Sequence, residues 1–214
     1  MFKKLAILLT IALFILPLEG YVSAELAVGV KKGDWIEYNV TYTGTPSLGH
    51  DVNWAHLEVT DVEEKRISVS IITKFPDGRT EVFNTTINLQ TGYLIDDFII
   101  PANLTTGDHF YDQKIGNITI ERTQEQIYAG ATRAVLYAST ATSTYIWDKT
   151  TGVSVEGDSQ EPTYTIHTIV ANTNMWKPSS QNGGDTAIFV AVIVCLVVLF
   201  AALAVRYRGK FNCH

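Results

Sequence analysis

The stretch Thr144–Glu156, TYIWDKTTGVSVE, decides how the middle of the chain folds. An apolar run ends at Trp147, the turn-forming residues 148–152 follow, and alternation of apolar and polar residues restarts at Val153. Glycine readily takes the positive φ that tight hairpin turns require, and Gly152 stands where the turn must close. The stretch therefore predicts a β-hairpin and not an active-site loop, because Asp148 has no histidine near it in the sequence to act as a catalytic partner.

The same alternation, rich in Tyr, Thr, Val and Ile, continues on both sides of this hairpin. The expected strands cover residues 35–43, 55–62, 67–75, 81–89, 118–128, 132–140, 144–147, 153–156 and 163–171. Short turns between successive strands indicate antiparallel pairing. We therefore expect an all-β domain of about eight to ten strands, forming a mainly antiparallel curved sheet or a barrel-like sheet. Only residues 93–112 break the alternation, and they predict a loop or a short helix near 94–106.

Both ends of the chain carry apolar segments. A basic start, an apolar run and small residues before position 25 are typical of a signal peptide over 1–24, cleaved after Ala24. Residues 186–205 are apolar and uncharged, long enough to cross a bilayer as a helix, and Arg206 follows at once. We expect an extracellular domain at 25–177, a flexible linker at 178–185 and a cytoplasmic tail at 206–214. The protein is then a single-pass protein of the cell membrane.

The charge and cysteine content exclude several classes of function. Residues 25–185 carry 21 acidic and 11 basic side chains, a net charge of −10, which disfavours binding to nucleic acid or anionic lipid. The only cysteines are Cys195 and Cys213, so the exported domain has no disulfide, no thiol nucleophile and no thiolate metal site.

Four segments carry a resemblance to a known group of proteins: GVKKGDWIEYNV at 29–40, DDFIIPANLTTGDHFYD at 96–112, NITIERTQEQIYAGATRAVLYAS at 117–139 and YIWDKTTGVSVE at 145–156. The chain resembles a family of uncharacterised archaeal secreted, membrane-anchored proteins. This resemblance implies an envelope protein and no particular activity. The D-x-x-T-G turn at 148–152 also resembles the hairpin of LolA-like lipoprotein carriers, which implies an open curved sheet around an apolar cavity.

Four N-x-T sequons predict glycosylation of an exported domain, at Asn39, Asn84, Asn103 and Asn117. Other candidate residues have simpler structural explanations. His50, Asp51 and His56 are more typical of exposed loops than of a metal site, and Asp96, Asp97, Asp108 and Asp112 lack the register of a calcium loop. Tyr38, Tyr42, Trp54 and Trp147 fit strand-pairing aromatics better than a sugar-binding platform.

No catalytic motif, cofactor motif or metal motif is present in the sequence. We therefore predict a non-catalytic cell-surface module, structural or partner-binding, whose partner is a protein, glycan or lipid of the cell envelope. Two alternatives stay open. One is a LolA-like carrier that holds a lipid or another apolar ligand in a curved β-sheet, and it needs a ligand-sized apolar cavity. The other is an envelope hydrolase.

Overall fold

The structure is a computed structural model that describes residues 26–46 and 50–179. The predicted signal peptide, membrane span and cytoplasmic tail lie outside the described residues, as does most of the predicted linker. Within those two ranges, no helix has the length and hydropathy that a bilayer crossing requires.

The described chain contains eleven strands. They are β1 (Trp35–Gly44), β2 (Trp54–Glu63), β3 (Arg66–Lys74), β4 (Thr80–Asn88), β5 (His109–Asp112), β6 (Gly116–Thr119), β7 (Arg122–Tyr128), β8 (Ala131–Ser139), β9 (Ser143–Asp148), β10 (Ser154–Gln160) and β11 (Tyr164–Thr173).

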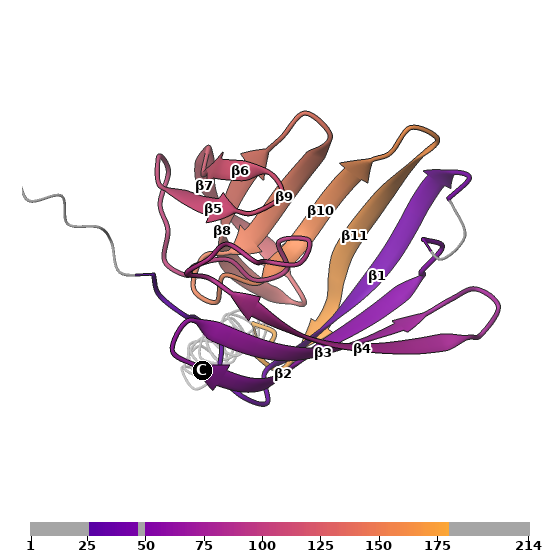
Figure 1. The fold of residues 1–214 in the computed structure, drawn as a ribbon, viewed down its shortest axis with the longest axis horizontal. Helices are drawn as coiled ribbons and strands as arrows, with labels where there is room; N and C mark the ends of the chain where they lie inside the picture. The colour runs from indigo at the N-terminus through magenta and orange to yellow at the C-terminus, as the bar shows by residue number, and fades with distance from the viewer. Residues whose placement is uncertain (1–25, 47–49, 180–214) are drawn as a thin grey trace, which may run out of the picture.

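Nine of the strands form one antiparallel sheet in the order β4-β3-β2-β1-β11-β10-β9-β8-β7. Figure 1 shows that this sheet is strongly curved, with β4 and β7 at its two ends and the β5–β6 hairpin standing in front of β7 to β9. All neighbours are consecutive in the chain except β1 and β11, where Ile36 lies opposite Thr173. The prediction of an all-β, antiparallel curved sheet is confirmed. The sheet is open and not a barrel, since β4 and β7 do not pair with each other in the described structure.

The alternation of each strand sorts its side chains between the two faces of the sheet. In β3, Ile67, Val69 and Ile71 are buried on the concave face, while Ser68 and Ser70 point to the convex face and are partly exposed. Corresponding residues of β1 and β2 continue the concave face, including Ile36 and Leu57. A face of this kind must be covered by other apolar residues to be stable in water.

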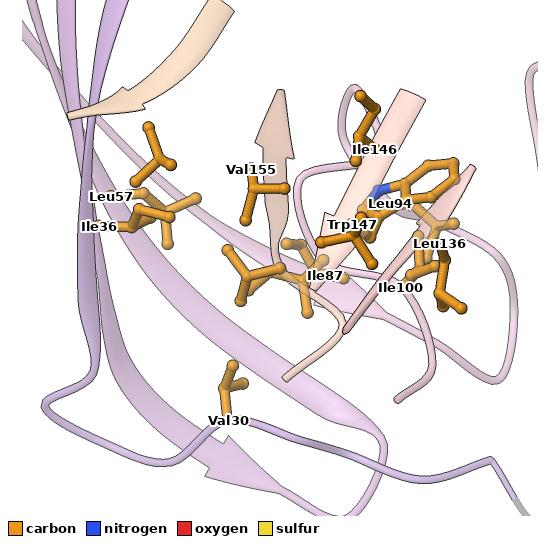
Figure 2. Close-up of a cluster of buried hydrophobic side chains, with 14 of the residues drawn as sticks. Val30, Ile36, Leu57, Ile87, Leu94, Ile100, Leu136, Ile146, Trp147 and Val155 are labelled. Atoms are coloured by element: carbon orange, nitrogen blue, oxygen red, sulfur yellow. The ribbon is translucent and has the colours of Figure 1, made fainter. Parts of the chain in front are cut away.

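The segment between β4 and β5 supplies that cover. Leu94 and Ile100 are buried against the concave face, close to Trp147 of β9 and Leu136 of β8 (Figure 2), and Ile99 is also fully buried. Backbone hydrogen bonds fix the segment to the β9–β10 turn, from Ile100 N to Gly152 O (3.0 Å) and from Ser154 N to Phe98 O (2.9 Å). The segment between β4 and β5 therefore covers part of the concave face of the sheet.

Residues 93–120 differ from the sequence-based prediction in two ways. The helix considered near 94–106 does not form, because Ile95, Asp96 and Asp97 have φ of 52°, 53° and 55° and turn the chain in the left-handed sense. The strand expected at 118–128 is divided into β6 and β7, and β5 is an additional strand that pairs with β6. These changes raise the number of strands to eleven, where eight to ten were expected.

Candidate functional site

The hairpin at Thr144–Glu156 is a structural element, as predicted. Asp148 is fully buried and accepts hydrogen bonds from Arg133 Nε (2.7 Å), from Thr151 N (2.8 Å) and from Thr151 Oγ1 (2.8 Å). The Arg133 guanidinium also lies over the Trp176 ring, 4.8 Å from its centroid. Asp148 therefore closes the turn and pairs with a half-buried cation, which leaves its carboxylate no access to a substrate.

The acidic residues considered for calcium are divided: Asp108 lies apart, whereas Asp96, Asp97 and Asp112 interact electrostatically with one another and with Lys114. Asp108 accepts hydrogen bonds from Thr105 N (2.7 Å) and Thr105 Oγ1 (2.9 Å) in a surface turn. Asp112 accepts from Lys114 N (2.7 Å), and Lys114 Nζ in turn lies 3.1 Å from Asp96 Oδ1. Across residues 26–46 and 50–179, no group of three or more His, Cys, Asp or Glu side chains could hold a metal ion.

Asp97 is the one unusual carboxylate in this region. It is 2% exposed, and its Oδ1 has no hydrogen-bond partner among the described residues. Burial raises its pKa to about 7, with a further contribution from the negative charges of Asp112 and Asp96. Its backbone carbonyl accepts a hydrogen bond from Trp147 Nε1 (2.7 Å), which holds the left-handed turn against β9. Such strained segments are often functional, but the Asp97 side chain is buried in the core, and only Asp96 of this turn is exposed.

The histidines considered for metal binding have separate neighbours. His50 Nδ1 lies 2.5 Å from the Tyr164 hydroxyl, and Asp51 follows it in the loop before β2. His56 stacks between Trp35 and Trp54 on the convex face, with ring centroids 5.6 Å and 5.9 Å away. The two histidines therefore belong to different clusters.

The aromatic residues considered for sugar binding are divided in the same way. Tyr38 and Trp147 are fully buried in the core, and Tyr42 is half-buried near the far end of β1. Trp54 is half-buried, but His56 covers one face of its indole and Lys74 Nζ lies 4.1 Å from its ring centroid. These four rings form no shared platform for a sugar.

The most enzyme-like cluster of side chains lies on the convex face. His167 Nδ1 is 2.8 Å from Asp158 Oδ1, its Nε2 is 4.0 Å from Glu156 Oε1, and the Tyr128 hydroxyl donates to Glu156 Oε2 (2.5 Å). Burial raises the pKa of Tyr128, and Glu156 raises it further. Because both imidazole nitrogens face carboxylates, neither is directed at a nucleophile, as general-base catalysis requires.

All four predicted glycosylation sites are on the surface. Asn39 lies on β1, Asn84 on β4 and Asn117 on β6, and Asn103 precedes β5; each of these four side chains is exposed. Exposure is needed for a glycan but does not demonstrate one, so glycosylation stays a prediction.

A hollow of about 490 Å³ lies at the β2–β3 turn. Its lining consists of polar and charged residues, namely Glu63, Glu64, Lys65, Arg66, Asn88 and Gln90. A site for an apolar ligand is lined mainly by hydrophobic and aromatic side chains. This hollow therefore does not supply the cavity that a lipid carrier needs.

Strand β4 at one edge of the sheet carries the most unusual surface. Val82 is 62% exposed and Phe83 is 56% exposed, on opposite faces of the same strand. Glu81 is the only charged residue between Thr80 and Asn88, and the pairing with β3 runs without a bulge. Natural proteins usually protect an edge strand with charges, proline, a bulge or a covering segment. Strand β4 has no proline and no bulge, and its single charge, Glu81, lies near one end. These devices therefore leave Val82 and Phe83 largely unprotected.

Strand β7 at the opposite edge also exposes an apolar side chain, Ile127 at 70%, but two charged residues and a packed segment protect this strand. Glu125 stands near its middle on the concave side, opposite Ala134, and the Arg122 guanidinium lies over the Tyr137 ring. The C-terminal segment packs beside the end of this strand, with hydrogen bonds from Trp176 Nε1 to Tyr128 O (3.0 Å) and from Ser179 N to Gly130 O (2.8 Å). The two edges of the sheet therefore differ in how readily they can accept another strand.

The sequence-based prediction placed a strand at 81–89 but missed its exposed position. One signal was available in the sequence. Val82 and Phe83 are adjacent apolar residues in a stretch otherwise rich in Thr and Asn, so one of them must lie on each face. Only the strand order shows that β4 ends the sheet.

Comparisons with known proteins give little further information. No protein-family model matches the chain. No curated protein matches it either. A solved structure titled "The Siderocalin Ex-FABP functions through dual ligand specificities" is similar over 74% of this chain and 80% of that chain, with 14% identity and a TM-score of 0.26. So low a TM-score does not establish a common fold or a common function.

Proposed function

We propose that this protein is a non-catalytic surface module of the cell envelope that acts by binding another polypeptide. The observation that carries the proposal is the exposed, weakly protected strand β4, with Val82 and Phe83 open to solvent. An edge strand of this kind offers backbone donors and acceptors in a row, and pockets or faces on either side give specificity.

The packing of the concave face supports this function over that of a carrier. In a carrier with a curved sheet, the concave face would hold the ligand. Here Leu94 and Ile100 fill the part of that face against Trp147. A ligand of lipid size would have to displace these buried side chains, each of which contributes about 1.5–3 kcal/mol by its burial.

The membrane anchor predicted at 186–205 fits the same function. A domain tethered by a short linker samples only the space near its own membrane, where the effective concentration of a partner in the same membrane is high. A shuttle between membranes would have to leave this position.

The test is native mass spectrometry of the full chain purified in detergent from its own host. The expected spectrum contains the chain bound to a polypeptide, without a lipid bound in fixed proportion. A lipid retained one to one by the wild-type chain would overturn the proposal in favour of the carrier. A second spectrum, taken after proteolysis of the same preparation, measures glycan mass at Asn39, Asn84, Asn103 and Asn117. Four bare asparagines would contradict the predicted glycosylation.

A further inference from the structure

The backbone of β4 alternates between groups that face β3 and groups that face away from the sheet. At the two ends of the ladder, Phe75 N donates to Arg79 O (3.0 Å) and Leu89 N donates to Lys65 O (3.0 Å). The backbone N–H and C=O groups of odd-numbered residues in this stretch therefore face β3. Those of even-numbered residues point outward, away from the sheet. Asn88 confirms the alternation, since its N–H donates outward to Tyr93 O (2.8 Å).

The outward groups form one uninterrupted run. Those of Asn88 are already used, because Tyr93 N also donates to Asn88 O (3.1 Å). The outward backbone groups of the other even-numbered residues have no hydrogen-bond partner in the described part of the chain. These residues are Thr80, Val82, Asn84 and Thr86. The run begins at Thr80 and ends at Thr86, so its midpoint is Phe83.

A second copy of the same strand can fill this run in a single register. An antiparallel strand of the same sequence, placed about a two-fold axis at Phe83, would pair Thr80 with Thr86 and Val82 with Asn84. Every outward group between Thr80 and Thr86 then gains a partner, and the pairing stops before Asn88. Symmetric self-pairing of one surface is the commonest arrangement in homodimers.

The side chains agree with the same register. Phe83 of one copy would face Phe83 of the other at a non-hydrogen-bonded position, where Cβ atoms are about 4.5–5.5 Å apart. The sole charge of the strand, Glu81, would lie opposite Thr85 of the second copy and not opposite another carboxylate. Neither a bulge nor a proline interrupts β4.

We propose that two copies of this chain associate through β4, as antiparallel strands centred on Phe83, so that their two sheets become one continuous sheet. The proposal rests on the proposed function and names the polypeptide partner as a second copy. The opposite edge offers no equivalent run, because the segment at 176–179 is hydrogen-bonded to Tyr128 O and Gly130 O at the end of β7.

The test is disulfide trapping with the full chain, expressed in cells that do not glycosylate asparagine. The background variant carries Cys195→Ala and Cys213→Ser, so that no native cysteine can react. With Phe83→Cys added, mild oxidation is expected to convert most of the chain to a covalent dimer, because the two Cβ atoms meet within reach of a disulfide. Ile127→Cys is the matched control, since Ile127 is 70% exposed on the other edge, and it is expected to stay monomeric.

A second variant separates edge pairing from general collision. Val82→Pro, added to Phe83→Cys, removes an outward N–H and leaves the ladder with β3 intact, so the trapped dimer is expected to fall at least tenfold. Val82→Thr keeps the N–H and the branched shape, and it is expected to preserve the dimer.

Three results would overturn the proposal: no dimer with Phe83→Cys, equal trapping with Ile127→Cys, or trapping unaffected by Val82→Pro. If Phe83→Cys instead links to a different protein, the second copy is wrong as the partner while the proposed function stands. A lipid bound one to one by a monomer would remove the proposed function itself.

Discussion

The β9–β10 and β3–β4 hairpins use similar turn residues for opposite purposes. Each turn contains an aspartate and a glycine with positive φ, Gly152 at 73° and Gly78 at 86°. The side chain of Asp148 is 0% exposed and paired with Arg133, whereas the side chain of Asp77 is 65% exposed at the tip of its hairpin. The first hairpin holds the interior together, and the second presents an edge strand to solvent.

This difference shows that a turn motif by itself does not indicate how much a turn contributes to stability. The β9–β10 turn is packed against the chain at 97–100. Ile100 N donates a hydrogen bond to Gly152 O, and Trp147 Nε1 donates one to Asp97 O. Within residues 26–46 and 50–179, the β3–β4 turn makes only local contacts, such as the hydrogen bond from Arg79 N to Asp77 Oδ1 (2.9 Å). Substitutions at matched positions of the two hairpins should therefore have very different effects.

Removal of the turn aspartate should give the largest difference. Asp148→Ala leaves the Arg133 guanidinium and the Thr151 N–H without their acceptor inside the protein, and we expect it to lower the free energy of unfolding by about 3–5 kcal/mol. Asp77→Ala, the matched control, loses one exposed hydrogen bond and should lower it by under about 1 kcal/mol. Urea unfolding of the two variants measures both values, and equal losses would contradict the comparison.

The two turn glycines should differ next. A Cβ on Gly152 would lie 2.2 Å from Ile100 O, whereas a Cβ on Gly78 would meet no atom within 4 Å. Both residues have positive φ, so alanine at either position costs about 1 kcal/mol in backbone conformation. Gly152→Ala must in addition push apart two buried backbones, and we expect a total loss of at least about 3 kcal/mol.

Thermal unfolding of the two glycine variants, each against the wild-type protein, provides the measurement. Gly78→Ala should lower the melting temperature by only a few degrees. A similar small shift for Gly152→Ala would show that the segment at 98–100 moves easily away from the turn.

The contrast between the hairpins also explains what the sequence could and could not predict. Alternation is a local property, so the strands and the hairpin at 148–152 were predictable from the residues themselves. Which strand ends the sheet depends on pairing between distant segments, above all Ile36 of β1 with Thr173 of β11, and no local pattern encodes it.

The candidate site was unpredictable for the same reason. Val82 and Phe83 read as ordinary strand residues until β4 is known to have a neighbour on one side only. In the sequence, Asp97 is one of four aspartates without the register of a calcium loop, but packing of residues 94–100 onto Trp147 buries it. In both cases the environment created by tertiary packing, and not the residue type, distinguishes the position.

Asp97 provides a pH-dependent test of how firmly the interior around β9–β10 is packed. Its pKa is raised to about 7 from an ordinary value of 3.8, so between these pH values the folded protein holds a proton that the unfolded chain has released. The free energy of unfolding should therefore fall as the pH rises from 4 to 7, by on the order of 1–3 kcal/mol from this group.

The variant Asp97→Asn cannot ionise and should remove this part of the slope, which makes the protein more stable than wild type at pH 8. Asparagine also tolerates the left-handed backbone at this position. Urea unfolding at pH 4, 6 and 8 decides the matter, with Asp77→Asn as the exposed control that should leave the slope unchanged. An unchanged slope in Asp97→Asn would mean that water reaches the carboxylate.

The smallest effect on stability is expected at β4, where function rather than packing is at stake. Val82→Lys places a charge on a side chain that is 62% exposed, so the free energy of unfolding should change by no more than about 0.5 kcal/mol. The same substitution puts a lysine on the edge, which opposes strand pairing, and the proposed association through β4 should weaken strongly. Unfolding at a chain concentration too low for association measures the first quantity, and sedimentation at a higher concentration measures the second. A large loss of stability would show that Val82 belongs to the core, whereas an unchanged mass in sedimentation would show that β4 does not join the copies.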